Sequence, residues 1–416
     1  MLFFLIFRVV DFVIISFATK IIPYLGGFAY IEVVRDSNLP KLISSLANFD
    51  GVYYVRIATQ GYSQFEQAFF PLYPLLIKIL SPVFTNNRLL TGLIISNLSF
   101  LLGLFVFVKY LHETQSTKHK ADKTGVEMEG LPAARSSIVS IFERALTGGK
   151  SRQDPSVWIV LFLLVFPTSF FFGAVYTEGL FFLLVISSLY FVKKERYILA
   201  GIFAFLASLT RLLGVFLIIP FLFTLWPKRS RVLKSYGPKV LLLLFPLLGL
   251  LTYSLYLFKT TGDPFFFLTA QPAFGANRST HLIFLPQVYF RYFKIFLTAQ
   301  PNFQYFISAF EFVIFNLVFI VLVFDLLRNL KIGLGFKFRI SNFDRLGLNL
   351  FSLINLVLPT LTGTFLSIPR FALLSLSFFI FLGQIKNLYL KIFLAIIFFI
   401  FHIVTLGFFA QGYFVS

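Results

Sequence analysis

The hydrophobic positions of this chain form long runs that are separated by shorter polar segments rich in Lys and Arg. Runs such as LLLLFPLLGLL (241–251) do not alternate between apolar and polar residues, as the strands of a membrane β-barrel would. An apolar run of about 20 residues crosses a bilayer as a helix. The pattern therefore predicts an all-α polytopic membrane protein with about 11 transmembrane helices. The predicted spans are 2–22, 89–110, 157–172, 179–192, 197–226 (two short spans, or one bent span), 240–258, 306–327, 346–363, 371–385 and 390–412.

Two polar stretches interrupt this pattern. Residues 23–86 form a long polar and aromatic loop, in which KLISSLANF and FFPLYPLLIKILSPVF are predicted to be interfacial helices that lie along the membrane. Residues 112–155 mix both signs of charge with Gly, Ser and Thr, which is typical of a solvated loop, and SSIVSIFERAL within it fits an amphipathic surface helix. We expect one transmembrane domain over residues 1–416.

Charge and composition narrow the class of protein further. The 416 residues are 58% hydrophobic and 13% charged, with a net charge of +19 and no cysteine. The positive-inside rule explains this basic excess, because Lys and Arg cluster between the spans, so no nucleic-acid partner is expected. The lack of cysteine excludes disulfides and thiol chemistry.

The distribution of charge also predicts a site on one face of the membrane. With the N-terminus inside, the basic segments 193–196, 227–239 and 328–345 fall on the cytoplasmic side together with the 112–155 loop. The opposite face receives the charged residues Asp50, Arg56, Glu178, Arg211, Asp263, Arg278 and Arg370. We therefore expect an extracytoplasmic site in an integral, multi-pass membrane protein, in the plasma membrane if the source is prokaryotic.

Asp50 is the candidate general base of this face. A carboxylate at a membrane surface among aromatic residues can have its proton affinity tuned for proton transfer, and Gly51 permits close approach of another molecule. The alternative is that Asp50 caps the helix formed by VYYVRIA. Arg8 and Asp11, which share one face of the first span, fit a mutually satisfied structural pair better than a functional one.

Five segments carry a resemblance to a known family. They are NFDGVYYVRIATQGY followed by QAFFPLYPLL, FPTSFFFGAVYTEGLFFLL, AGIFAFLASLTRLLGVFLIIP, TGDPFFFLTAQPAF and SIPRFALLSLSFFIFLG. In this order they resemble the motifs of the PIG-V family, membrane mannosyltransferases of the GT-C class. The chain departs from the family pattern at Phe49, which replaces the usual Trp, at Phe371, which replaces the usual Tyr, and at Ala273-Phe274, which lacks the usual Trp.

The resemblance implies a GT-C-like fold and transfer of a sugar, mannose in this family, from a polyprenyl-phosphate donor to an acceptor hydroxyl, with inversion at the anomeric carbon. It implies Asp50 as the catalytic base. The substrate-binding residues that it suggests are Arg56, Tyr176, Glu178, Arg211, Asp263 and Arg370. Guanidinium groups suit a departing lipid phosphate, because they bind phosphate through two hydrogen bonds.

Simpler roles stay open for these residues: snorkelling for Arg370, a salt bridge for Glu178 and a turn for Asp263. No metal or other cofactor is expected, although Asp50 and Glu66 together are a weaker candidate for a cation site. The alternative functions are a lipid or glycan transporter or flippase, a non-catalytic scaffold, and an oligosaccharide ligase that uses a diphosphate-linked donor. The sequence does not identify the acceptor.

Overall fold

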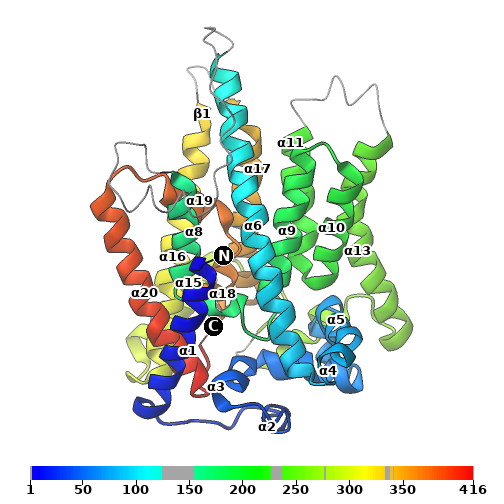
Figure 1. Ribbon diagram of the computed structural model, residues 1–416, viewed down its shortest axis with the longest axis vertical. Coiled ribbons are helices and arrows are strands. Elements are labelled where there is room, and N and C mark those ends of the chain that lie inside the picture. Colours follow the sequence, from blue (N-terminus) through cyan, green and yellow to red (C-terminus); the bar gives the residue numbers. More distant parts are fainter. Residues whose placement is uncertain are drawn as a thin grey trace.

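Helices make up nearly all of the regular structure in the computed structural model (Figure 1). The structure describes residues 2–123, 154–225, 237–275, 278–332, 338–340 and 342–415. Within these ranges the strands are β1 (Leu330–Ile332) and β2 (Phe338–Ile340), which pair antiparallel with Leu330 opposite Ile340. The predicted helical class is confirmed, and this short hairpin is an addition that the hydrophobic pattern did not indicate.

Five helices in the described part of the chain are long and apolar enough to cross a membrane. They are Arg88–Thr114 of α6 (Arg88–Lys123), Leu241–Thr261 of α13 (Gly237–Thr261), α16 (Phe303–Asn329), Phe343–Thr362, which joins α17 (Phe343–Val357) to η8 (Leu358–Thr362), and α20 (Leu388–Ala410). Each coincides with a predicted span. The full count of about 11 spans stays a prediction, as does the GT-C-like arrangement. Helix α1 (Leu2–Ile21) covers the first predicted span.

The long helices expose apolar side chains outward. In each of α13, α16 and α20, only 33% of an apolar 18-residue stretch of the helix is buried inside the protein. Exposed residues include Leu251, Ile320 and Phe393. Monomeric soluble proteins rarely leave apolar patches of this extent uncovered, so these faces are those of a membrane protein.

Several apolar helices are shorter than the about 20 residues of a straight membrane span. They are α8 (Pro155–Val165), α9 (Glu178–Lys193), α10 (Tyr197–Thr210), α11 (Ile218–Leu225) and α19 (Leu376–Gly383), which are connected through η4 (Ser169–Phe172), η5 (Leu212–Leu217) and α18 (Ile368–Ala372). Helix α9, with 16 residues, extends only about 24 Å, against a hydrocarbon core of about 30 Å. In Figure 1, α9 and α10 lie side by side between α6 and α13. Because these helices end early, their ends bring Glu178, Arg211 and Arg370 into the interior.

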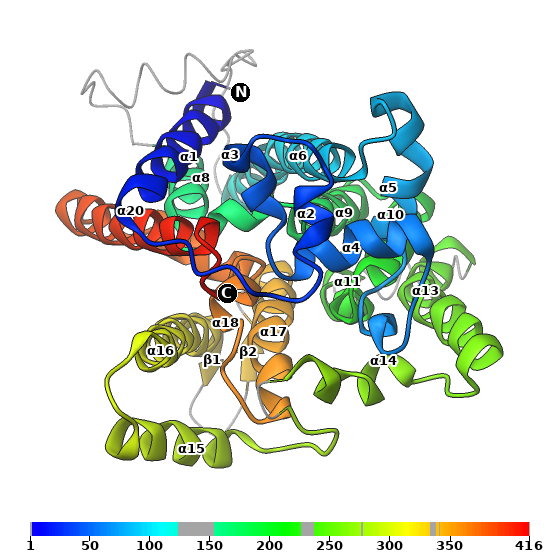
Figure 2. The same ribbon diagram turned by 90° about the horizontal axis from the view of Figure 1, so that it is seen from below.

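Short helices gather at the end of the molecule opposite β1 (Figures 1 and 2). This end contains α2 (Glu32–Arg35), α3 (Lys41–Ser44), η1 (Ser45–Ala47), α4 (Asp50–Gln60), η2 (Glu66–Ala68), α5 (Leu72–Leu80), η3 (Ser81–Phe84), α14 (Phe266–Thr269), η7 (Gln271–Phe274) and α15 (Leu285–Thr298). The segments predicted to be interfacial are helical here. Their orientation along a membrane surface stays a prediction.

The structure corrects the predicted start of the polar loop at residue 112. Helix α6 continues to Lys123, because Glu, Gln and Lys are good helix formers and extend the helix beyond its apolar part. The predicted amphipathic helix SSIVSIFERAL lies outside the described residues, as does most of the basic segment 227–239.

Two buried polar networks join the helices. Asp11 accepts a hydrogen bond from Arg8 Nη1 at 2.8 Å, and its other oxygen lies 2.8 Å from His402 Nε2, which ties α1 to α20. This geometry favours the structural interpretation of the Arg8–Asp11 pair.

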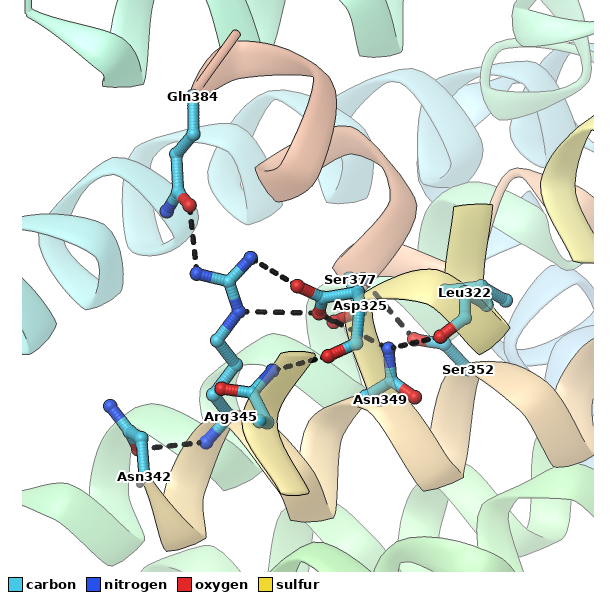
Figure 3. Close-up of polar contacts among 9 residues, drawn as sticks. Leu322, Asp325, Asn342, Arg345, Asn349, Ser352, Ser377 and Gln384 are labelled. Carbon is cyan, nitrogen blue, oxygen red and sulfur yellow. Dashed lines mark hydrogen bonds and ion pairs between the residues drawn. The ribbon is translucent and has the colours of Figure 1, made fainter. Parts of the chain in front are cut away.

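The second network surrounds Asp325 of α16 (Figure 3). The Asp325 side chain is 0% exposed. Arg345 of α17 donates to both carboxylate oxygens, through Nε at 3.2 Å and through Nη2. Asn349 Nδ2 at 3.2 Å and Ser377 Oγ at 3.4 Å also donate to Oδ2. Arg345 Nη1 donates to Gln384 Oε1 at 2.7 Å. The network therefore fastens α16 to α17 and to the short helix α19.

Candidate active site

Asp50 is the first residue of α4, and the backbone before it is sharply turned. Phe49 is the N-cap residue, with φ of 59°, and its side chain makes no capping hydrogen bond. The alternative in which Asp50 caps this helix is therefore wrong, because Asp50 lies inside the first turn. Its Oδ2 instead accepts a hydrogen bond from Arg370 Nη1 at 2.6 Å, and its side chain is 26% exposed.

Gly51 allows α4 to approach the turn before α9. A Cβ atom at Gly51 would lie 3.3 Å from the carbonyl oxygen of Val175 and 3.6 Å from the ring of Tyr176. Tyr176 in turn donates a hydrogen bond from its hydroxyl to the carbonyl of Asn48 at 2.8 Å. The YTE segment therefore packs directly against the segment that holds Asp50.

Four charged groups alternate in sign across this contact. Arg370 Nε lies 3.4 Å from Glu178 Oε1, and Arg211 Nη1 donates to the same oxygen at 2.7 Å. The acid–arginine cluster thus runs Asp50, Arg370, Glu178, Arg211, with two carboxylates and two guanidinium groups. It joins α4, α18, α9 and the residue that follows α10.

The buried guanidinium of Arg370 stays charged because it faces two carboxylates. Burial alone would lower the pKa of Arg370, but the carboxylates of Asp50 and Glu178 raise it well above its ordinary value. The guanidinium therefore remains protonated throughout the range in which a protein is folded.

The cluster has unused hydrogen-bonding capacity. Glu178 is 1% exposed, yet its Oε2 has no hydrogen-bond partner within the described part of the chain. Buried polar atoms are nearly always paired with protein or water. This oxygen and the exposed part of Asp50 therefore keep hydrogen-bonding capacity that the described part of the chain does not use.

Aromatic rings line the two arginines. The guanidinium carbon of Arg211 lies 4.8 Å from the ring centre of Phe371, and that of Arg370 lies 5.3 Å from the ring centre of Tyr176. Tyr54, one helical turn after Asp50, also faces Tyr176, with ring centroids 6.5 Å apart. Burial raises the pKa of Tyr54, and the carboxylates of Glu178 and Asp50 raise it further, so its hydroxyl stays neutral.

Arg278 is a further cation near the cluster that the resemblance did not select. Its Nη1 donates to Gln271 Oε1 at 3.0 Å. Burial lowers the pKa of Arg278, and the Asp50 carboxylate partly offsets this shift. The distribution of charge along the sequence places Arg278 on the same face as Asp50, but no motif distinguishes it there.

The structure separates Arg56 from the acid–arginine cluster. Arg56 pairs with Glu66, donates from Nη2 to Ser63 Oγ at 3.1 Å and lies 4.1 Å from the ring centre of Tyr30. Asp50 and Glu66 pair with different arginines, Arg370 and Arg56, and this pairing does not favour a joint cation site. No group of three or more His, Cys, Asp or Glu residues that could hold a metal ion occurs within the described ranges.

Asp263 has the geometry of a turn residue. Its Oδ1 accepts from the backbone N–H of Phe265 at 2.8 Å, and its Oδ2 accepts from Thr269 Oγ1 at 3.0 Å. Both oxygens are thus engaged within the loop, which favours the turn interpretation over contact with a substrate.

Fold and site together define a helical membrane protein with a partly open acid–arginine cluster at one end. In comparison with known proteins, the family model described as Mannosyltransferase (PIG-V) matches residues 1–147, about a third of the chain. This match supports the resemblance to a PIG-V-like mannosyltransferase family, and it includes Asp50 but ends before Glu178. No curated protein and no solved structure matches the chain.

Proposed function

We propose that this protein is a membrane mannosyltransferase that moves mannose from a polyprenyl-phosphate donor to an acceptor hydroxyl. The family match and the apolar helices support this activity. We choose the acid–arginine cluster as the active site because the partly exposed carboxylate of Asp50 lies beside the Arg370 guanidinium, whose pKa is raised.

In the proposed reaction, Asp50 is the general base and Arg370 and Arg211 bind the donor phosphate. The phosphate competes with Asp50 for Arg370, so that the carboxylate becomes available to the acceptor hydroxyl. The acceptor oxygen then forms a bond to the anomeric carbon while the bond from that carbon to the phosphate oxygen breaks. The proton passes to Asp50, and the bonding electron pair leaves on the polyprenyl phosphate.

This direct displacement inverts the configuration at the anomeric carbon. The phosphate leaves as an anion, so the reaction needs cations rather than an acid at the leaving group. We propose no metal requirement, because guanidinium groups already neutralise both carboxylates of the cluster.

We place the Asp50 end of the molecule on the extracytoplasmic side. Lys193, Lys194 and Arg345 belong to segments near the other end, and the positive-inside rule assigns such segments to the cytoplasm. The donor then reaches the cluster from the outer leaflet. The acceptor is a glycan, lipid or protein that bears a free hydroxyl.

The Asp50→Asn variant tests the proposal. Purified protein is supplied with polyprenyl-phosphomannose, nucleotide-diphosphate mannose or a diphosphate-linked glycan, and transfer to a panel of hydroxyl acceptors is measured. We expect transfer from the first donor alone, and a kcat about 10³-fold lower in Asp50→Asn, because loss of a general base costs on the order of 10²–10⁴.

The matched control is Asp36→Asn, which changes an exposed aspartate of the same 23–86 loop and should transfer mannose at the wild-type rate. Full activity of folded Asp50→Asn would remove Asp50 as the base. Transfer from the diphosphate-linked glycan would instead identify an oligosaccharide ligase.

A further inference from the structure

A buried carboxylate outside the acid–arginine cluster holds the backbone that leads to Arg370. Glu311, in the apolar helix α16, is 1% exposed. Its Oε1 accepts a hydrogen bond from the backbone N–H of Ser367 at 3.2 Å, and its Oε2 accepts from the Tyr292 hydroxyl at 3.1 Å. Ionisable groups inside apolar membrane helices are costly and usually serve a function.

The segment that Glu311 holds has an unusual backbone. Ser367 has φ of 66° and is the N-cap residue of α18, which contains Arg370. A residue other than glycine keeps such a left-handed conformation only where its surroundings enforce it. The N–H that Glu311 accepts belongs to this same residue.

Tyr292 extends the same support. Its hydroxyl accepts a hydrogen bond from the backbone N–H of Phe365 at 3.0 Å and lies 3.2 Å from Thr364 Oγ1. The backbone from residue 364 to residue 367 is therefore fixed from one side by α15 and α16. Arg370 follows after less than one helical turn, and its guanidinium contacts both Asp50 and Glu178.

We propose that Glu311 is a positioning residue for Arg370. Its carboxylate fixes the turn at Ser367, and this turn sets the position of the guanidinium between the two acids. Glu311 itself touches neither donor nor acceptor. The inference rests on the proposed function, since it assigns Arg370 to the donor phosphate.

The test compares Glu311→Leu with Glu311→Gln in full-length protein. Leu removes both acceptor atoms, whereas Gln keeps an oxygen for the Ser367 N–H, and the Tyr292 hydroxyl can then donate to Thr364. Misplacement of a catalytic group by about 1 Å costs about 10²-fold, so we expect kcat/KM to fall by about that factor in Glu311→Leu. Glu311→Gln should stay within about threefold of wild type, since it retains the critical acceptor.

A double-mutant cycle separates positioning from general stability. In a protein that already carries Arg370→Lys, Glu311→Leu should cause no further fall in kcat/KM, because the effects of substitutions in residues that act as a unit do not add. Asp325→Asn, which removes a carboxylate from the same helix, should lower thermal stability while the folded fraction keeps its kcat/KM. If Glu311→Leu fails to fold, Tyr292→Phe is used in its place. We expect Tyr292→Phe to lower kcat/KM by a smaller factor, and to have no effect on kcat/KM in protein that already carries Arg370→Lys.

Undiminished transfer by folded Glu311→Leu would overturn the proposal. So would a fall in kcat/KM that is equally large when Glu311→Leu is introduced into wild type and into Arg370→Lys. Binding of polyprenyl phosphate, measured directly, keeps the test independent of the proposed reaction. If wild type binds this lipid but transfers no mannose, the proposed function fails, and weaker binding by Glu311→Leu still supports the positioning role. Equal binding by both proteins overturns it.

Discussion

The cluster around Asp50 and the network around Asp325 each contain an aspartate paired with an arginine, but they differ in how many hydrogen bonds the carboxylate accepts. Both Asp325 oxygens receive hydrogen bonds from Arg345, and Oδ2 receives two more from Asn349 and Ser377 (Figure 3). Asp50, in contrast, is 26% exposed and pairs through one oxygen with Arg370. Glu178 beside it keeps an oxygen without a hydrogen-bond partner in the described ranges.

The comparison shows that an ion pair inside a membrane protein is not by itself a sign of function. A carboxylate whose acceptor sites are all occupied fastens helices together and has nothing left to offer a ligand. A carboxylate that keeps part of its capacity can accept a proton or a hydroxyl group when a substrate arrives. The difference lies in what remains unpaired, rather than in the presence of charge.

The largest expected contrast is in stability. Asp325→Asn should lower the free energy of unfolding by about 3–5 kcal/mol, because removing one partner of a buried pair leaves the other uncompensated. Asp50→Asn should change it by at most about 1 kcal/mol, since Asp50 is partly exposed and Glu178 still neutralises Arg370. Unfolding of both purified variants in detergent, followed by heat or denaturant, measures the contrast. Equal losses in the two variants would show that both clusters are structural.

The next contrast concerns the two arginines. Arg370→Lys replaces a planar group that can bind a phosphate through two hydrogen bonds by a single ammonium, so kcat/KM for donor transfer should fall by about 10²-fold, or about 2.7 kcal/mol. Arg345→Lys serves as the matched control and should weaken the fold while each folded molecule remains fully active. A similar loss of activity per folded molecule in both variants would remove the distinction between the clusters.

The smallest expected effect concerns the ring beneath the arginines. Phe371→Leu removes the aromatic face that lies 4.8 Å from Arg211. Cation–π contacts contribute about 0.5–1 kcal/mol, so the KM for the donor should rise about two- to fivefold. Phe371→Tyr keeps the ring, and its KM should match wild type. An unchanged KM in Phe371→Leu would show that the ring does not hold the arginine for phosphate binding.

The residues of the candidate site were predictable from the sequence, and so was a salt bridge for Glu178, but the contact between Asp50 and Arg370 was not. Asp50, Glu178, Arg211 and Arg370 stand out as charges in or beside apolar segments on one predicted face. The alternation of acidic and basic side chains in space depends on where the short helices α9 and α10 begin and end inside the molecule. The hydrophobic pattern of the sequence does not determine these positions. Only the prediction of two short spans or one bent span in residues 197–226 signalled a short helix, and it concerned α10 and not α9.

Other features gave a partial signal or none. The turn alternative for Asp263 was indicated by the sequence and agrees with its contacts, whereas nothing in the sequence indicated that Arg56 pairs with Glu66 of its own loop. Glu311 stands alone in an apolar run, so the sequence does not show that it reaches Ser367, more than fifty positions later. The β1–β2 hairpin is too short for alternation to be recognised.

A structure with polyprenyl phosphate bound tests the central claim most directly. The account predicts that the phosphate lies within hydrogen-bond distance of Arg370 and Arg211, that Asp50 is released from Arg370, and that the Asp325 network is unchanged. A phosphate bound elsewhere, with the contact between Asp50 and Arg370 intact, would contradict it.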